Sequence, residues 1–532
     1  MTTEPAYRAQ LLSVIAHARA GALDRAWQLY AAMDLPGRES DPAALSVKGR
    51  LLKDLGLRSS GAARRRLYAD AAAAYRSAAE LGGATYPLIN AATLSLLCGD
   101  PDASRLLAQE VLDRIERLPD EPETPYYRAA TRAEALLLLG RDEDAQDALA
   151  DAMALAPHAW EDHASTLRQF AIVLAEQGLD ATWLDAHRPP RSLHFGGHMA
   201  FRADSASAAL SGKIAAVLEQ ERVGFGYGAL AAGADIIVAE ALIERGAALH
   251  VLLPGGVDGF AALSVDPHGP EWRRRFDAAL AAAETVRAVE PAPSPPDEAM
   301  IALADEIAMG AALINARLLA SAGVQLLVMA DDDDAADGAS ARSRDAWART
   351  GRRQHVVRAA REDVEVAPGT VPIAPRRRAA ALAVRAPATD VDQNVRQAGL
   401  EAIKAALDRC PTPDMAASFT GDDVVLAYDD IGQAAAAAGI LAEAMLSVGG
   451  QYGIAECLRD PFSGSARLIG RARDLARAAA ASAPAGTACI TGDFAAALAV
   501  AAPEAFRTEF IGELSAPAGA APIDLFALRP LS

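Results

Sequence analysis

The spacing of apolar side chains divides the chain into three stretches. Up to about residue 187, apolar positions recur every three or four residues, as at Leu11, Leu12, Ile15 and Ala16, which predicts amphipathic helices without strands. A proline break at 187–191 ends this pattern, and short apolar runs then alternate with helical stretches. Residues 359–375 carry three prolines and several charges, which is typical of a linker. The pattern predicts three domains, 1–187, 191–358 and 376–532.

Helix pairs in the first domain share a turn pattern. Glycine stands in the turns Ala20–Asp24, Cys98–Asp100 and Leu139–Asp142, and a small residue follows each glycine after five positions: Ala26, Ser104 and Ala145. Such a residue lets the second helix cross close to the first. The domain resembles the tetratricopeptide-repeat (TPR) class, although its spacing is not a regular 34-residue period. The stretch 86–94 is more specifically similar to the divergent repeat domain that precedes sensor or effector domains in bacterial conflict-system proteins.

Stacked helical hairpins of this kind form a surface for a peptide, a partner domain or a ligand. The resemblance therefore implies a protein partner for the helical repeats. A helical scaffold without a ligand of its own is the alternative.

The middle stretch alternates between strands and helices. This alternation predicts an α/β, Rossmann-like parallel sheet covered on both faces, whose ligands lie at the carboxyl ends of the strands. Strands are expected at Leu193–Phe195, Val223–Phe225, Ala248–Leu253, Val286–Val289, Gln325–Met329 and His355–Val357, and helices at 206–221, 230–245, 270–284, 297–322 and 340–350.

A glycine-rich turn follows the second predicted strand. Gly226, Gly228 and Gly233 lack a Cβ, so the backbone can bend tightly and approach a ligand closely. The helix that follows offers unpaired N–H groups and a partial positive charge to an anion. The turn therefore predicts a phosphate or nucleotide site. The alternative is that these glycines only permit close packing of strand and helix.

Several segments of this domain are similar to SLOG-type Rossmann-like domains: 195–201, 226–242, 249–254 and 264–276. The resemblance covers about 192–358 and implies a nucleotide or nucleotide-derived ligand, such as an ADP-ribose-like molecule, in a signalling or defence protein. It assigns the ligand cradle to Gly196, Gly197, Gly226, Gly228 and Gly233.

Three polar residues accompany this cradle. Asp235 lies in the first turn of the helix and is either a ligand contact or a helix-terminal residue. Glu240 either meets a ribose hydroxyl or is simply exposed. His198 follows a strand end, where it could hydrogen-bond a phosphate or serve as an ordinary polar residue.

A nucleotide-processing hydrolase is an alternative function for this domain. Residues 254–259 resemble the PGGxGT signature of phosphoribohydrolases, but Asp258 is an insertion and Phe260 replaces the threonine. Glu240 would be the candidate catalytic residue. The acidic run 331–334 is better explained as a solvated loop than as a cation site.

The last stretch again mixes strands and helices, which predicts a ferredoxin-like α+β domain. Strands are expected at Ala379–Val384, Val424–Tyr428, Gly453–Glu456 and Ile523–Leu528, and helices at 391–409, 431–448 and 466–481.

The segments 418–430, 453–464 and 472–498 and the final strand resemble a class III nucleotidyl cyclase domain. Active members hold two metal ions on two aspartates. The first aspartate position is Val384 here, whereas the second is retained as Asp422. The base-reading lysine falls on Ser418. Of the two transition-state residues, the asparagine falls on Arg473 and the arginine is retained as Arg477.

A valine cannot bind a cation, and each lost electrostatic group costs a factor of roughly 10²–10³ in rate. We therefore expect a pseudoenzyme with Asp422 as a weak metal site, and a homodimer formed through this domain. An active cyclase that uses Mg²⁺ or Mn²⁺ in an atypical site is the alternative.

Composition limits the kinds of partner that we expect to bind and the cellular compartment that we expect for the protein. The net charge of −19 argues against general nucleic-acid binding, because no basic surplus exists to neutralise phosphates. Cys98, Cys410, Cys457 and Cys489 lie far apart, which predicts reduced, buried thiols in the cytoplasm. No apolar run reaches bilayer length, so no membrane segment is expected. Together the patterns predict a nucleotide-sensing signalling or scaffold protein.

Overall fold

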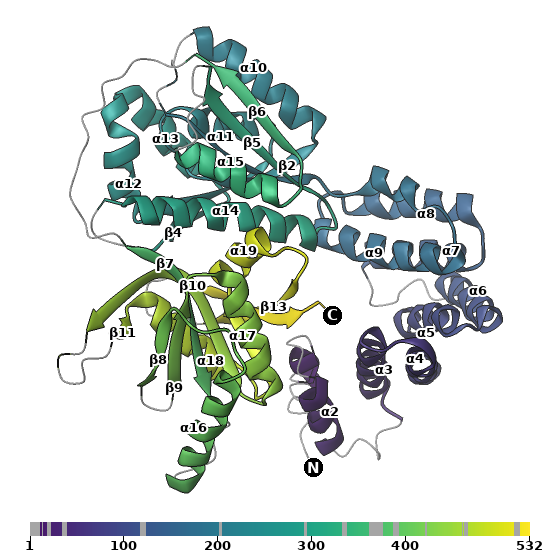
Figure 1. Ribbon diagram of the computed structural model, residues 1–532. Helices are drawn as coiled ribbons and strands as arrows, with labels where there is room; N and C mark the ends of the chain where they lie inside the picture. Colours follow the sequence, from purple (N-terminus) through teal and green to yellow (C-terminus); the bar gives the residue numbers. More distant parts are fainter. Residues whose placement is uncertain are drawn as a thin grey trace. The chain divides into compact units, whose positions relative to one another are not determined.

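A computed structural model describes residues 11–12, 14–18, 23–33, 40–117, 124–199, 201, 205–291, 295–331, 338–360, 376–386, 393–420, 423–459, 461, 466–514 and 522–531. The chain forms two compact units (Figure 1). The first comprises Met1–Pro189 with Leu318–Ala320, and the second comprises Pro190–Arg317 with Ser321–Ser532.

The described part of the first unit is helical, as the apolar spacing predicts. Gly99 and Gly140 have φ angles of 94° and 73° and follow the ends of two helices, where the left-handed conformation favours glycine. Ser104 and Ala145 are buried, as the close helix crossings require. The elements are α2 (Leu23–Ala32), α3 (Pro42–Leu57), α4 (Gly61–Gly82), α5 (Thr85–Cys98), α6 (Pro101–Arg117), α7 (Pro125–Leu138), α8 (Asp142–Leu155), α9 (Trp160–Gln177) and the 3₁₀ helix η2 (Thr182–His187).

The second unit begins with a fully parallel sheet in the order β4-β3-β2-β1-β5-β6. The prediction of a parallel α/β sheet is therefore confirmed. Its strands are β1 (Arg191–Gly197), β2 (Val223–Gly228), β3 (Ala248–Pro254), β4 (Thr285–Val289), β5 (Gly323–Ala330) and β6 (Gln354–Ala359).

Helices cover both faces of this sheet. Leu193 and Phe195 of β1 pack in a core with helices α10 (Ser205–Gln220), α11 (Ala234–Glu244), α12 (Val257–Ser264) and α13 (Pro270–Ala282). Ser192 and His194 point to the other face, toward α14 (Glu298–Leu318) and α15 (Ala339–Arg349). The short α12 was not expected from the sequence, and α11 begins four residues later than predicted because the turn after β2 is longer.

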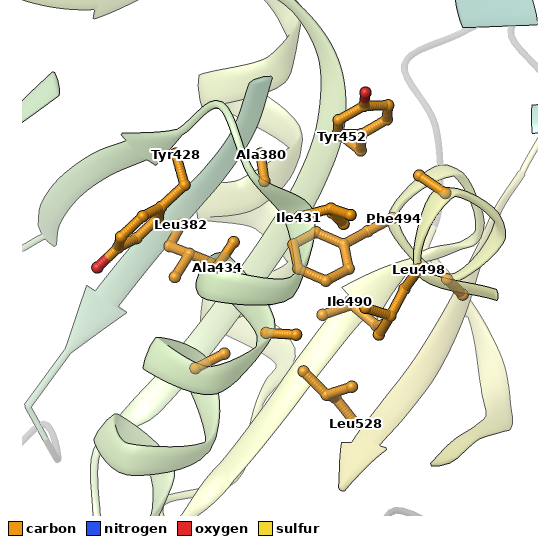
Figure 2. Packing of buried hydrophobic residues seen from close by; sticks show 14 of the residues in the cluster. Ala380, Leu382, Tyr428, Ile431, Ala434, Tyr452, Ile490, Phe494, Leu498 and Leu528 are labelled. Carbon is orange, nitrogen blue, oxygen red and sulfur yellow. The ribbon is translucent and has the colours of Figure 1, made fainter. Parts of the chain in front are cut away.

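A second sheet follows, in the order β13-β14-β12-β10-β7-β9-β8, with β11 paired to β10. Helices α17 and α19 share a core with one face of it (Figure 2), and α18 packs on the other face. Its elements are β7 (Arg377–Arg385), α16 (Gln393–Leu407), β8 (Met415–Thr420), β9 (Asp423–Tyr428), α17 (Ile431–Glu443), β10 (Ser447–Arg459), β11 (Ala466–Ile469), α18 (Arg471–Ser482), β12 (Thr487–Thr491), α19 (Gly492–Ala501), β13 (Phe506–Leu514) and β14 (Ile523–Pro530).

Helix α14 joins the cores of the two sheets. Its buried Leu303, Ala304 and Ile307 belong to the same apolar cluster as Phe494 and Tyr452 of the second sheet's domain. At Gly310, an added Cβ would lie only 2.0 Å from the carbonyl oxygen of Ala496 in α19, so the two helices touch backbone to backbone. The two sheets therefore belong to one packed body.

Among the described helices, α14 alone is long and apolar enough to cross a membrane by length and composition. More than half of its apolar window, 56%, is buried inside the protein. Its packing is that of a core helix.

All four cysteines are free, but the prediction that they are buried holds only for Cys489. Cys457 is exposed because it lies near the end of β10, where the strand runs beyond the core.

Candidate functional site

The carboxyl ends of β1 and β5 meet where the strand order reverses, which is the usual ligand position in such sheets. Gly197 lies here, and an added Cβ would be 2.1 Å from the carbonyl oxygen of Val328. The next residue, His198, donates its backbone N–H to Val328 and accepts a hydrogen bond at Nδ1 from the Ala330 amide, 3.1 Å away. Gly197 and His198 thus fasten β1 to β5.

The glycine turn after β2 is closed in this structure. The amide of Ala232 donates to the Ser264 carbonyl, and the amide of Ala234 donates to the His198 carbonyl. The amide of Ala231 donates to the Asp235 carboxylate at 3.1 Å. Leu230 and Ala232 are fully buried. These amides already have acceptors inside the protein, which corrects the expectation that they are free for an anion.

The glycines of this turn have packing partners. A Cβ on Gly226 would lie 2.3 Å from the Leu242 side chain, and one on Gly228 would lie 2.7 Å from the Phe195 carbonyl oxygen. Gly233 precedes α11 with a φ angle of 126°, which only glycine adopts readily. The alternative explanation, close packing of strand and helix, accounts for Gly226 and Gly228, and backbone conformation accounts for Gly233. A ligand at this turn remains a prediction that requires the turn to open.

Asp235 is the most perturbed acid near the sheet edge. Burial raises its pKa to about 7, and the nearby Asp305 carboxylate adds to the rise, whereas the hydrogen bond from Ala231 opposes it. A carboxyl group with such a pKa can give or take a proton near neutral pH. Asp235 also lies close to Gly196. A Cβ added at Gly196 would lie 4.0 Å from Asp235 Oδ1.

Glu240 lies away from this acid. Both of its oxygens accept hydrogen bonds from Arg275 of α13, at 2.8 and 2.5 Å. The Arg275 guanidinium also stacks over Trp272, 4.2 Å from the ring centre. These two hydrogen bonds hold Glu240 in a structural ion pair with Arg275. This arrangement argues against Glu240 as the catalytic residue of a hydrolase.

A buried polar chain behind Asp305 was not expected from the sequence. His194 Nε2 lies 3.1 Å from Asp305, and His194 Nδ1 lies 3.0 Å from Gln325 Nε2. Because the Gln325 amide donates, Nδ1 accepts and the Nε2–H donates to Asp305. Gln325 in turn accepts from Gln354 at 2.6 Å. The chain fixes the position of Asp305, whose charge contributes to the raised pKa of Asp235.

One sequence signal could have found His194. Strands alternate their faces with a period of two, and β1 places His194 on the same face as Ser192 within an apolar run. Two polar side chains on one buried face require partners, and these come from α14 and β5.

The residue after Asp305 faces the other sheet. Glu306 accepts hydrogen bonds from Arg378 of β7 at 2.7 Å and from the Tyr452 hydroxyl of β10 at 3.0 Å. Figure 2 shows that hydroxyl pointing away from the apolar cluster. Burial raises the pKa of Glu306, while Arg378 lowers it. Consecutive residues of α14 therefore contact the polar groups of two different sheets.

The cyclase-type positions lie in the second sheet. Val384 is fully buried in the apolar core of β7, where a cation could not be coordinated. Arg473 pairs with the neighbouring Asp474, and Ser418 lies in β8. Asp422 lies outside the described residues. Within the described part of the chain, no three His, Cys, Asp or Glu side chains gather as a metal site would require.

The retained Arg477 is engaged by a residue that the sequence analysis did not single out. Its Nε donates to Asp423 Oδ2 at 2.6 Å. The other oxygen of Asp423 lies 2.8 Å from Arg385 Nε, as an ion pair without hydrogen-bond geometry. Asp423 is buried at the start of β9. Arg477 is therefore already paired with a carboxylate of the chain itself.

We expect Asp423→Asn to destabilise this domain by about 1–2 kcal/mol, since two partly exposed arginines lose a charged acceptor. Urea unfolding with hydrogen exchange in β9 measures the change. Asp474→Asn is the matched control, because its carboxylate is exposed, and it should leave β9 unaffected. Equal effects of the two substitutions would contradict a structural role for Asp423.

Comparisons with known proteins agree with parts of this description. The family model described as Tetratricopeptide Repeats-Sensor matches residues 2–95. No curated protein matches the chain.

Among solved structures, adenylate cyclases from Trypanosoma brucei in their monomeric state are 13% identical, with 29% of this chain and 90% of theirs covered and a TM-score of 0.25. The adenylyl cyclase CyaB from P. aeruginosa is 12% identical over 29% of this chain and 95% of its own, with a TM-score of 0.24. The guanylate cyclase domain of RhGC from Catenaria anguillulae, in complex with GTP, is 13% identical over 29% and 98%, with a TM-score of 0.25.

Proposed function

We propose that the chain is a signalling protein in which the Rossmann-like sheet senses a nucleotide or nucleotide-derived ligand and passes the signal to a cyclase-like domain. One observation carries this proposal: Asp305 and Glu306, adjacent on α14, contact the two sheets separately. A change in the charge of Asp235 acts on Asp305 of α14. The same helix contacts Arg378 and Tyr452 of the second sheet through Glu306.

The ligand in this proposal binds at the carboxyl ends of β1, β2 and β5, beside Asp235, and opens the turn after β2. Opening releases the amides of Ala231, Ala232 and Ala234, which then become donors for an anionic group. The internal hydrogen bonds make the closed state the resting state. SLOG-type resemblance supports a nucleotide or ADP-ribose-like molecule, and the repeat unit supports a protein partner.

Calorimetric titration of the full chain with a panel of nucleotides and ADP-ribose compounds tests this binding. We expect one class to bind, and Asp235→Ala to weaken it at least tenfold, whereas Asp258→Ala on the exposed first turn of α12 should not. A folded protein that binds none of the panel would remove the sensing proposal. What remained would be a scaffold.

The cyclase-like domain is proposed to be catalytically inactive, to serve as the receiving domain and to form a homodimer. The buried Val384 and the engaged Arg477 support this view. We expect no cyclic nucleotide above background when the protein is incubated with ATP or GTP and Mn²⁺, as measured by mass spectrometry. Product that disappears in Asp422→Ala would instead establish an active cyclase with an atypical site.

The four free cysteines and the mostly buried apolar helix α14 support a soluble protein of the cytoplasm. This location belongs to the same proposal.

A further inference from the structure

Helices α5, α7 and α9 of the repeat unit share a polar face. Each carries two polar residues seven positions apart: Tyr86 and Thr93, Tyr127 and Glu134, and Asp162 and Gln169. Seven residues make about two turns, so the members of each pair lie on one side of their helix, roughly 10 Å apart. The three helices thus present two parallel rows of polar groups.

Hydrogen bonds run across the helices within each row. In the first row the Tyr127 hydroxyl donates to Asp162 at 2.6 Å. In the second, Thr93 donates to Glu134 at 2.5 Å and Gln169 donates to the same oxygen at 3.0 Å. Helix packing alone does not need such rows, because apolar side chains hold these helices together on their other sides.

Glu134 keeps one oxygen for another partner. Both printed bonds end on Oε1, and no described residue donates to Oε2. Burial raises the pKa of Glu134, against the hydrogen bonds from Thr93 and Gln169 and the charge of Lys53. Glu134 is half-buried and its Oε2 is not among the buried atoms without a partner, so a donor from outside the protein can reach this oxygen.

Lys53 of α3 is the complementary group. Among the described residues, none forms a hydrogen bond or ion pair with its ammonium, and Glu134 is more than 4.0 Å away, since no ion pair joins them. Burial lowers the pKa of Lys53, whereas the charges of Glu134 and Asp54 raise it. A cation and an anion therefore face the same space without neutralising each other.

The other row adds aromatic surface. Tyr86 is 54% exposed and Tyr127 is 42% exposed, and the charge of Tyr86 contributes to the raised pKa of Tyr127, so the two lie near one another. Exposed tyrosines on a polar face are typical of ligand and partner contacts. The charges nearby, Lys53 and Arg50 against Asp54, Glu134 and Asp162, leave no positive surplus for a polyphosphate.

We propose that this face of the repeat unit binds a small zwitterionic ligand of the α-amino-acid type, with an aromatic side chain. Its carboxylate meets Lys53, its ammonium donates to Glu134 Oε2, and its side chain extends about 10 Å along the helices to Tyr86 and Tyr127. Such a ligand supplies both missing charges at once. The site is independent of the nucleotide proposed for the Rossmann-like sheet.

Calorimetric titration of the full chain with L-phenylalanine, L-tyrosine and L-tryptophan tests the proposal. At least one is expected to bind. Phenethylamine, which lacks the carboxylate, and 3-phenylpropionate, which lacks the ammonium, are expected to bind at least tenfold more weakly. Equal binding of the truncated compounds, or no binding of any aromatic amino acid by the folded protein, would overturn it.

Two variants assign the site. Lys53→Met and Glu134→Gln should each weaken binding at least tenfold, while Lys48→Met and Glu80→Gln, on α3 and α4 away from the two rows, should not. Unchanged affinity in folded Lys53→Met and Glu134→Gln would refute the site. Should either variant fail to fold, the truncated compounds test the same claim on the unsubstituted chain.

Discussion

Replacing Gly310 by valine is expected to disrupt the packing between helix α14 and the domain of the second sheet and to cost about 3 kcal/mol. An added Cβ would lie 2.0 Å from the Ala496 carbonyl oxygen and 2.3 Å from its carbon. Because both contacts are backbone atoms, no side chain can move aside to make room. Hydrogen exchange of the full chain should show faster opening of α14 and α19.

Gly212→Ala is the control for this experiment. Gly212 lies in helix α10 with no atom within 4 Å of an added Cβ, so alanine should stabilise the helix by about 0.5–1 kcal/mol. If Gly310→Val left the exchange of α19 at its original rate, α14 would not be packed against the cyclase-like domain as described.

Asp235→Asn is expected to stabilise the second unit at pH 8 and not at pH 4. Burial raises the pKa of Asp235 from 3.8 to about 7. Between these values the folded state binds more protons than the unfolded state, so stability falls as the pH rises from about 4 to 7. This pKa difference corresponds to roughly 4 kcal/mol of folding stability that is lost at high pH. The amide of the variant cannot ionise, so the variant does not lose this stability.

Urea unfolding followed by proteolysis of the second unit, at pH 4 and pH 8, measures this difference. The asparagine can still accept the hydrogen bond from the Ala231 amide, so the turn after β2 is retained. Asp258→Asn, in an exposed position of α12, should change stability by less than about 1 kcal/mol at either pH. If Asp235→Asn stabilised the second unit equally at pH 4 and at pH 8, burial would not raise the pKa of Asp235 as described.

Much of the fold could be predicted from the spacing of apolar residues. The strands of the parallel sheet stand out as short apolar runs, and each predicted strand lies inside an observed one. The inner strand β5 is buried along its whole length, whereas the edge strands β4 and β6 are largely accessible. In the domain of the second sheet, only three residues separate the alanine-rich helix α17 from the buried start of β10. The end of the helix was therefore predicted five residues too late.

Other strands of that domain carry weak signals. β13 has no buried residue and its polar residues do not mark a buried face, so it was not expected. β12 consists of five buried residues just before the apolar helix α19, and a short apolar run of this kind fits a strand or a helix equally well. These elements complete a sheet that is larger than the predicted ferredoxin-like pair of units.

The candidate site was only partly visible in the sequence. Glycines at a turn are compatible with an anion site and with tight packing, and the deciding facts are tertiary: which carbonyl accepts each amide, and which side chain fills each gap. Asp235 was identified, but its partner Asp305 lies 70 positions away on α14. Likewise, the bond between Arg477 and Asp423 joins residues that no local pattern connects.

The most direct test of coupling through α14 compares hydrogen exchange of β10 around Tyr452 in the full chain and in Asp235→Asn at pH 8. Tyr452 lies in β10 of the second sheet, and Asp235 lies in α11, which packs on the first sheet. Glu306 of α14 accepts a hydrogen bond from Tyr452, and the charge of the neighbouring Asp305 acts on Asp235. The account predicts that the substitution slows exchange in β10 as well as in α11. Slower exchange confined to α11 and the strands beside it would contradict the account.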